Sequence, residues 1–268
     1  MEIEVNGVKA HYVDEGEGPV IVLLHGFTMS THSWRFNIAP LAKRFRVIAV
    51  DLPGFGQSEK PRQFLYDMTG FARWVCDFLD ALGVCRAAFV GNSMGGGVAY
   101  TVATTEPDRV SSLVLVDAVG YQPRNERFFI FRIMGIPWLG EFSTATLNGL
   151  AVRLILRTFI FHDPGFVTAD VVREYIAPLK SAGGRAAALR TIRTIDFDAA
   201  PGSVPCRRPT LILWGDRDRI VPVSHAQLFA RDLQDAKLHV FENAGHFPQV
   251  ERAEAFNHEV ETFVAAHP

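Results

Sequence analysis

Four short apolar runs constrain the fold of this chain more than any other feature of its sequence. They are rich in Val, Leu and Ile and occupy residues 19–26, 45–51, 87–93 and 111–117, and further strands are expected at residues 209–216 and 236–242. A strand with one face in water alternates apolar and polar residues, whereas these runs are apolar almost throughout, which is typical of strands buried on both faces. Such strands belong to parallel sheets that are covered by helices. The runs therefore predict a doubly wound α/β sheet.

Segments with helical periodicity separate these runs. Residues 67–82 place apolar side chains at helical spacing, and Gly83 suits the position just past the end of a helix. Further helices are expected from about residue 94, over residues 223–234 and from about residue 251. At the N-terminus, two alternating segments joined by Asn6-Gly7 predict a β-hairpin, since this dipeptide favours a tight turn.

Residues 121–205 interrupt the alternation of strands and helices. They are rich in Arg, Phe, Ile and Ala, and they show helical periodicity without a clear strand. A gap of this length between two core strands is too long for a plain loop. We therefore expect a core domain made of residues 1–120 and 206–268, with residues 121–205 forming a helical cap over the sheet.

Composition argues against several classes of protein. The net charge is −2 with no block of like charges, whereas nucleic-acid binding needs a concentrated basic surface. No apolar run reaches the roughly 18 residues of a membrane span, and the first residues lack the basic and apolar regions of a signal peptide. Three cysteines without a paired spacing argue against a disulfide framework and a structural zinc site. We expect a cytoplasmic monomer or homodimer without nucleic acid or membrane segment.

A glycine-rich loop at residues 89–100, FVGNSMGGGVAY, is the first candidate for chemistry. It lacks the Gly-Lys-Ser/Thr of a phosphate loop and the G-x-G-x-x-G of a dinucleotide site. It does contain G-x-S-x-G, with Ser93 between Gly91 and Gly95, after a predicted strand and before a predicted helix. A sharp turn there presents the serine as a nucleophile, and glycine on either side avoids a clash of Cβ with the turn or a neighbouring strand.

A serine nucleophile needs a base and an acid that orients the base. When the serine lies on a turn of this kind, the acid follows it along the chain and the histidine follows the acid. His246 is the favoured base, because it lies in the loop directly after the last predicted strand. Asp216 and Asp218 follow the preceding strand. Asp216 abuts that strand and is expected to cap the turn, whereas Asp218 lies further out and is the favoured acid. Asp117, after another predicted strand, is the alternative acid.

Attack on a carbonyl also requires donors for the oxyanion that forms. The carboxyl ends of parallel strands meet at one edge of an open α/β sheet, so the serine, the acid and the base are expected to lie together there. We expect the amides of Met94 and Phe27 to stabilise the oxyanion, one directly after the serine and the other in the loop after an early strand. His25 in that loop is expected to be a buried structural residue.

At these stretches the chain resembles the α/β-hydrolase fold superfamily, in its branch of capped serine hydrolases. The matching stretches are VLLHGF, VIAVDLPGFGQSEKP, GNSMGGGVA, PDRVSSLVLVDA, PTLILWGDRDRIVP and AGHFPQVERAEAFN. The resemblance implies a mostly parallel eight-stranded sheet with helices on both faces and a helical cap that shapes substrate choice. It also implies Ser93 as nucleophile, Asp218 as acid and His246 as base, with no metal or organic cofactor needed.

The resemblance is compatible with several functions. HGF followed by SW is similar to small esterases and lipases, which makes a carboxylesterase the first expectation. GNSMGG is similar to the loop of carbon–carbon bond hydrolases that act on aromatic ring-cleavage products. A lactonase, a perhydrolase and a ligand-binding receptor on the same fold are further alternatives. Dehalogenases and epoxide hydrolases carry an aspartate nucleophile, and Ser93 at that position argues against both.

The start of the cap and the loop after the base supply the expected substrate pocket. Apolar side chains are concentrated there, and small-molecule pockets are mostly apolar. Each of these side chains could instead pack the cap onto the core. The candidate pocket residues are Phe128, Phe131, Met134, Ile136, Trp138 and Phe247. The expected partner is a small-molecule ester with an apolar group of small or medium size.

Overall fold

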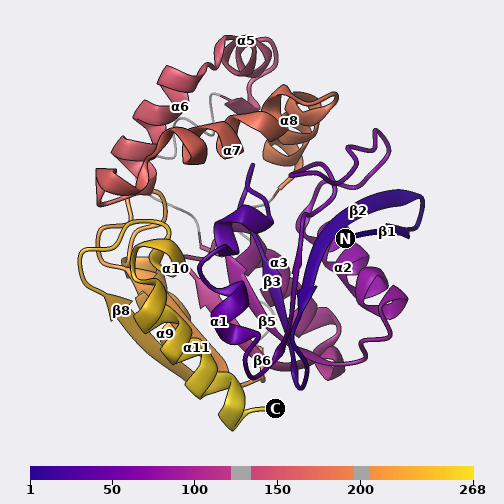
Figure 1. Ribbon diagram of the computed structural model, residues 1–268, viewed down its shortest axis with the longest axis vertical. Coiled ribbons are helices and arrows are strands. Elements are labelled where there is room, and N and C mark those ends of the chain that lie inside the picture. The colour runs from indigo at the N-terminus through magenta and orange to yellow at the C-terminus, as the bar shows by residue number, and fades with distance from the viewer. Residues whose placement is uncertain (122–133, 196–205) are drawn as a thin grey trace.

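The computed structural model describes residues 1–121, 134–195 and 206–268, which surround one sheet (Figure 1). The strands are β1 (Glu2–Val5), β2 (Val8–Glu15), β3 (Val20–Leu24), β4 (Arg46–Val50), β5 (Ala87–Asn92), β6 (Val110–Val116), β7 (Thr210–Gly215) and β8 (Ala236–Phe241). Within the described residues they form an eight-stranded sheet in the order β1-β2-β4-β3-β5-β6-β7-β8. β1 and β2 pair antiparallel to their neighbours, and β3 to β8 run parallel to one another. The predicted mostly parallel sheet is confirmed.

Two apolar clusters explain why the strands lack polar alternation. Val22 and Leu24 of β3 belong to one cluster, whereas Ile21 and Leu23 belong to the other, on the opposite face of the sheet. The first face is covered by α2 (Met68–Ala81), α3 (Met94–Thr105) and α9 (Ser224–Asp232), and the second by α1 (Ile38–Leu41) and α11 (Ala253–Ala266). Helices on both faces remove both sides of each inner strand from water, as the apolar runs predicted.

The ends of local elements follow from a few polar and glycine positions. Asp67 begins α2, because its side chain accepts a hydrogen bond from the Gly70 N–H at 2.7 Å and satisfies a free amide of the first turn. Gly83 lets the chain leave this helix with a φ of +68°. Asn6 and Gly7, with φ of 51° and 74°, make the turn between β1 and β2. The predicted helix at 67–82 and the predicted hairpin are confirmed.

Between β6 and β7 the described residues form helices and no strand. These are α5 (Leu139–Thr146), α6 (Gly149–Ile155), the π-helix η4 (Leu156–Ile160), the short η5 (Pro164–Phe166), α7 (Ala169–Lys180) and α8 (Gly184–Thr194). Figure 1 shows α5 to α8 as a layer at one end of the sheet. The limits predicted for the core and the cap stay a prediction. In the part of the chain that the structure describes, no helix has the length and apolar character needed to cross a bilayer.

A third apolar cluster joins this helical layer to the segment that follows β8. Side chains of α6, η4 and α7 pack with Phe247 and Val250. Phe247 is 1% exposed, and the rings of Phe161 and Tyr175 lie with their centroids 5.6 and 6.1 Å from its own. Burying a side chain of this size contributes roughly 2 kcal/mol. The contact therefore fixes the layer against the loop that carries His246.

Candidate active site

Ser93 lies in the sharp turn between β5 and α3, where its backbone is strained. Its φ of 54° and ψ of −118° lie in a region that costs about 1–3 kcal/mol for a residue with a side chain. Four backbone hydrogen bonds hold it there. The N–H donates to the carbonyl of Val116 at 2.9 Å, and the carbonyl accepts from the N–H groups of Gly96, Gly97 and Val119 at 3.0, 3.2 and 3.2 Å. Strain maintained in this way is a mark of functional sites.

The glycines that flank Ser93 are required by space. A Cβ on Gly91 would lie 2.2 Å from the carbonyl oxygen of Gly95, and a Cβ on Gly95 would lie 2.2 Å from that of Leu24. Both contacts are with backbone, so no side-chain rotation can relieve them. The turn therefore fits against β3 and the start of α3 only when these two positions lack a side chain.

We expect Gly95→Ala to lower the free energy of unfolding by more than about 3 kcal/mol, because the added methyl group overlaps a backbone oxygen. The matched control is Gly149→Ala in α6, where an added Cβ meets no atom closer than 3.8 Å. Chemical denaturation of both variants measures the effect. Equal stabilities of the two variants would show that the turn tolerates a side chain, against this expectation.

His246 and Asp218 follow β8 and β7, and they meet at the edge of the sheet where Ser93 lies. Nδ1 of His246 donates to Oδ2 of Asp218 over 2.7 Å, and both side chains are buried. Oδ1 of Asp218 accepts hydrogen bonds from the N–H groups of Ile220 and Val221 at 2.7 and 3.1 Å, so the turn orients the carboxylate. With the proton on Nδ1, Nε2 is free to accept another. Ser93 and His246 line one cavity.

Backbone contacts hold the loop that carries His246. Its N–H donates to the carbonyl of Ile160 in η4 at 2.8 Å. Its carbonyl accepts a hydrogen bond from Nδ2 of Asn92, the residue before Ser93, at 3.2 Å. The loop is thus attached both to the turn that carries the serine and to the helical layer.

Asp216, the other carboxylate after β7, braces the turn instead. One of its oxygens accepts a hydrogen bond from the Ala244 N–H at 3.3 Å, and the other pairs with Arg217 at 3.2 Å. Its side chain is 28% exposed, whereas that of Asp218 is fully buried. The structure therefore places Asp218, and not Asp216, against the ring of His246.

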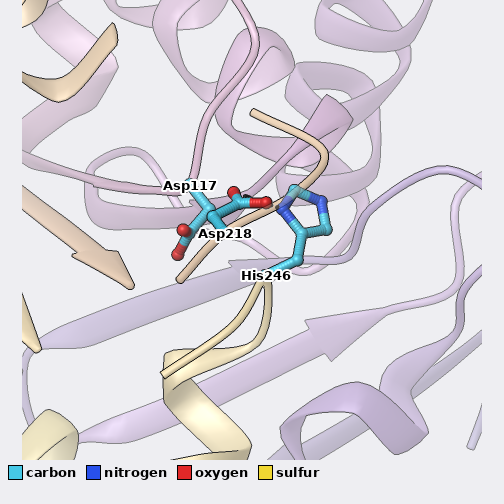
Figure 2. A group of neighbouring side chains, drawn as sticks. All are labelled: Asp117, Asp218 and His246. Carbon is cyan, nitrogen blue, oxygen red and sulfur yellow. Dashed lines mark hydrogen bonds and ion pairs between the residues drawn. The ribbon is translucent and has the colours of Figure 1, made fainter. Parts of the chain in front are cut away.

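Asp117, after β6, forms a buried pair of carboxyl groups with Asp218. Figure 2 shows the two side by side next to the ring of His246, with one ligand atom of each residue within 4.8 Å of the others. Oδ1 of Asp117 accepts a hydrogen bond from the Gly215 N–H at 3.1 Å, and Oδ2 meets no donor among the described residues. Histidine and carboxylate groups can also bind a metal ion, but here the ring and the Asp218 carboxylate are hydrogen-bonded to each other.

The loop after β3 is fixed by His25. This histidine is fully buried; its Nδ1 donates to the carbonyl of Gly26 at 2.8 Å, and its Nε2 accepts from the Leu52 N–H at 2.9 Å. A trans peptide points its C=O and N–H in opposite directions, so holding the Gly26 carbonyl also sets the direction of the Phe27 N–H. The Met94 N–H is the first amide of α3 and has no acceptor within its own helix. Phe27 lines the same cavity as Ser93, and Met94 directly follows Ser93 in the chain.

A cavity of about 280 Å³ lies between the serine and the helical layer. The predicted pocket residues Met134 and Phe247 line it. Most of its wall is apolar, and α6, η4 and α7 supply six of the eighteen described lining residues. The described lining includes no lysine, arginine, aspartate or glutamate. The cavity therefore offers an apolar site that opens on Ser93 and His246.

Two predicted pocket residues do not reach this cavity. Ile136 and Trp138 are 50% and 89% exposed and are absent from its lining, so their prediction is corrected. They lie in the turn before α5, and the part of that helix that faces the cavity carries Ser143 and Thr144. The other two predicted residues, Phe128 and Phe131, lie outside the described residues.

The sequence of this chain matches a family model for the alpha/beta hydrolase fold over residues 19–253. The chain belongs to the α/β-hydrolase fold family. The matched range runs from β3 into α11 and includes Ser93, Asp218 and His246. The resemblance found in the sequence motifs is thereby confirmed at the level of the family and the fold.

Three proteins illustrate the relatives of this α/β hydrolase. It is 32% identical over 261 residues to the uncharacterized hydrolase YugF of Bacillus subtilis (strain 168), across 97% of this chain and 94% of the relative. A crystal structure of a mutant of the meta-cleavage product hydrolase CumD has a TM-score of 0.85 and 29% identity, with 99% and 98% of the chains covered. The crystal structure of a membrane phospholipase A, described as a bacterial virulence factor, has a TM-score of 0.83 and 30% identity, with 99% and 85% covered.

Sequence patterns missed much of the cavity wall in this α/β hydrolase. Val152, Ile155 and Leu156 line it from α6 and η4, and Tyr175 lines it from α7. The signal available in the sequence was the amphipathic spacing of these helices. That spacing identifies an apolar face but does not reveal whether the face packs on protein or borders a cavity.

Burial, followed by the charge of the neighbouring Asp218, raises the pKa of Asp117 well above its ordinary value of 3.8. We therefore expect Asp117 to keep its proton to higher pH than an ordinary aspartate does, because a second charge beside the buried Asp218 carboxylate is unfavourable. Its φ of +44° is a conformation that Asp and Asn tolerate better than most residues. Asparagine is accordingly the natural replacement with which to test its protonation.

Asp117→Asn keeps the shape of the side chain and cannot ionise. In the wild type, folded Asp117 keeps its proton at pH values where the unfolded chain has lost it, so the free energy of unfolding falls as the pH rises above about 4. We expect the variant to be more stable than wild type by about 1 kcal/mol or more at pH 8, and by less at pH 5. Thermal unfolding at both pH values measures this. The control is Asp108→Asn, whose side chain is exposed; a gain that does not change with pH would contradict a neutral Asp117.

Proposed function

We propose that this chain is a serine hydrolase that cleaves uncharged carboxylic esters with apolar groups of small or medium size. The observation that carries the proposal is the placement of Ser93. It lies on a strained turn that lines an apolar cavity, and the same cavity is lined by a histidine whose Nδ1 is hydrogen-bonded to Asp218. A serine in this setting has a base within its site and a group that orients the base.

The reaction follows from the proposed roles of these groups. Oγ of Ser93 attacks the ester carbonyl while Nε2 of His246 accepts the hydroxyl proton, and Asp218 stabilises the imidazolium that forms. The amides of Phe27 and Met94 hold the oxyanion. The protonated His246 then gives its proton to the leaving alcohol, which leaves an acyl group on Ser93. A water molecule deprotonated by the same histidine releases the acid and restores the serine.

The cavity supports an uncharged substrate. Moving a carboxylate into an apolar site without a partner costs several kcal/mol, and the described lining offers no cationic side chain. The cavity volume of about 280 Å³ lies just below the roughly 300–1,000 Å³ that small-molecule sites occupy. A short or medium apolar acyl group therefore suits it better than a long chain.

The alternative function is that of a carbon–carbon bond hydrolase acting on an aromatic ring-cleavage product. The GNSMGG motif and the similarity to the meta-cleavage product hydrolase CumD support it. Ring-cleavage products carry a carboxylate, for which the described part of the cavity provides no cationic partner. Lactone hydrolysis and perhydrolysis need the same nucleophile and base, so they remain outcomes of the same test.

An activity screen distinguishes these functions. Purified wild type and Ser93→Ala are assayed with p-nitrophenyl esters from acetate to laurate, a set of lactones and a ring-cleavage product. We expect the highest kcat/KM for short or medium esters in the wild type, and loss of this activity in the variant. Cleavage of the ring-cleavage product without ester hydrolysis would establish the alternative. Tight ligand retention with very slow turnover would instead indicate a receptor.

A further inference from the structure

Glu251 is a buried carboxylate for which the proposed reaction has no role. It ends α10 (Pro248–Glu251) and is 5% exposed. Oε2 accepts a hydrogen bond from the Gly245 N–H at 2.7 Å, and Oε1 accepts one from the Asp163 N–H at 2.8 Å. Among the described residues, no lysine or arginine forms an ion pair with this carboxylate. Backbone amides are thus its main polar partners.

Burying a charged carboxylate is unfavourable unless other interactions offset the cost of removing it from water. Burial raises the pKa of Glu251, and the N–H groups of Asp163, Gly245 and His162 oppose that rise. Hydrogen bonds to a charged acceptor are stronger than those between neutral groups, but desolvating the carboxylate offsets much of the gain. An apolar side chain could fill the same space, so what distinguishes glutamate here is that its two oxygens bond two separate segments.

The first of these segments carries the base and the second carries the wall of the cavity. Gly245 directly precedes His246, and Asp163 closely follows Ile160, which lines the cavity at the end of η4. The two segments touch directly. The His246 N–H donates to the carbonyl of Ile160 at 2.8 Å, and a Cβ on Gly245 would lie 2.3 Å from that same oxygen.

The loop that carries the acid is attached to the same wall. Arg219 follows Asp218, and its guanidinium donates to the carbonyl of Thr158 in η4 at 2.8 Å. This element is a π-helix of five residues. Such helices are rare in proteins overall, but those that occur are often found at functional sites. Glu251 fixes the chain just beyond this element, through its hydrogen bond from the Asp163 N–H.

We propose that Glu251 is a positioning residue that holds the His246 loop in register with the η4 wall of the cavity. The inference rests on the proposed function and goes beyond it, because it links the position of the base to the size of the acyl group accepted. Displacing this carboxylate moves the wall and the base together. A reacting group misplaced by about 1 Å can cost about 100-fold in rate.

The test is Glu251→Gln, which keeps the size of the side chain but places an NH₂ group against one of the two backbone donors. We expect kcat for p-nitrophenyl esters to fall by about 10-fold or more, and the ester length with the highest kcat/KM to shift. The matched control is Glu254→Gln at the exposed start of α11, for which both quantities stay at wild-type values. A variant with lower stability but unchanged kcat and unchanged length preference would overturn the proposal.

A second measurement uses the wild type and applies even if the variant does not fold. Protonating Glu251 weakens both of its hydrogen bonds, so the protection of the Gly245 and Asp163 amides from hydrogen exchange, relative to the intrinsic exchange rate at each pH, should decrease together as the pH falls. The preference between butyrate and octanoate esters should change over the same pH range. Loss of protection at different pH values, or a constant preference, would contradict the proposal. Ester hydrolysis by the wild type at pH 8 tests the proposed function alone. Hydrogen exchange at the two amides tests the role of Glu251 separately, because it can be measured whatever the substrate is.

Discussion

Ser93→Ala is expected to lower kcat for p-nitrophenyl esters by about 10³-fold or more, since no covalent acyl intermediate can form without Oγ. The cavity, the His246–Asp218 pair and the backbone amides stay in place, so KM should change much less than kcat. Steady-state kinetics across the ester series measures both. Near wild-type turnover by this variant would exclude the proposed nucleophile.

The control for this variant is Ser112→Ala in β6. Ser112 is fully buried, and its Oγ has no hydrogen-bond partner among the described residues, so losing the hydroxyl removes no hydrogen bond. We expect its kcat and its unfolding temperature to stay near those of the wild type. A comparable loss of activity in this control would mean that the effect of Ser93→Ala reflects a disturbed sheet rather than lost chemistry.

Asp218→Asn is expected to lower kcat by about 10³- to 10⁴-fold. The new amide can still accept the hydrogen bonds of Ile220 and Val221 through Oδ1, but it presents an NH₂ group to Nδ1 of His246. The ring then carries its proton on Nε2 and cannot accept one from the serine. The fold is kept while the base is lost, and kinetics together with thermal unfolding separate these two effects.

Two further variants decide which carboxylate is the acid. Asp216→Asn changes a residue that braces the same turn without touching the ring, so it should keep most of the activity. If Asp218→Asn retained activity that the double variant with Asp117→Asn lost, Asp117 would be the acid. A larger loss from Asp216→Asn than from Asp218→Asn would also reject the assignment.

Elements with a strong local pattern could be predicted from the sequence. The apolar runs predicted the parallel strands, because burial on both faces leaves no position for a polar side chain. Gly83 marked the end of α2, which the chain leaves through a positive φ. The G-x-S-x-G motif predicted a sharp turn at Ser93, since both glycines lie against backbone oxygens.

The cavity wall could not be predicted in the same way. Trp138 and Ile136 were expected in the pocket because they are apolar and lie near the start of the insertion, yet both are exposed. Val152, Leu156 and Tyr175 line the cavity instead, from helices that cross the sheet edge later in the chain. Which face of a helix borders a cavity depends on how the helices pack on one another, and periodicity does not record that packing.

The sequence by itself determined the parallel sheet, the turn at Ser93 and the order in which the acid and base follow the serine. Each of these depends on local spacing or on residues at the ends of strands. Only the tertiary structure decided that Asp218 rather than Asp216 bonds to His246, that Asp117 lies beside it, and that Glu251 joins the base loop to the cavity wall. These contacts connect segments far apart in the chain, and their distances follow from packing that no local pattern encodes.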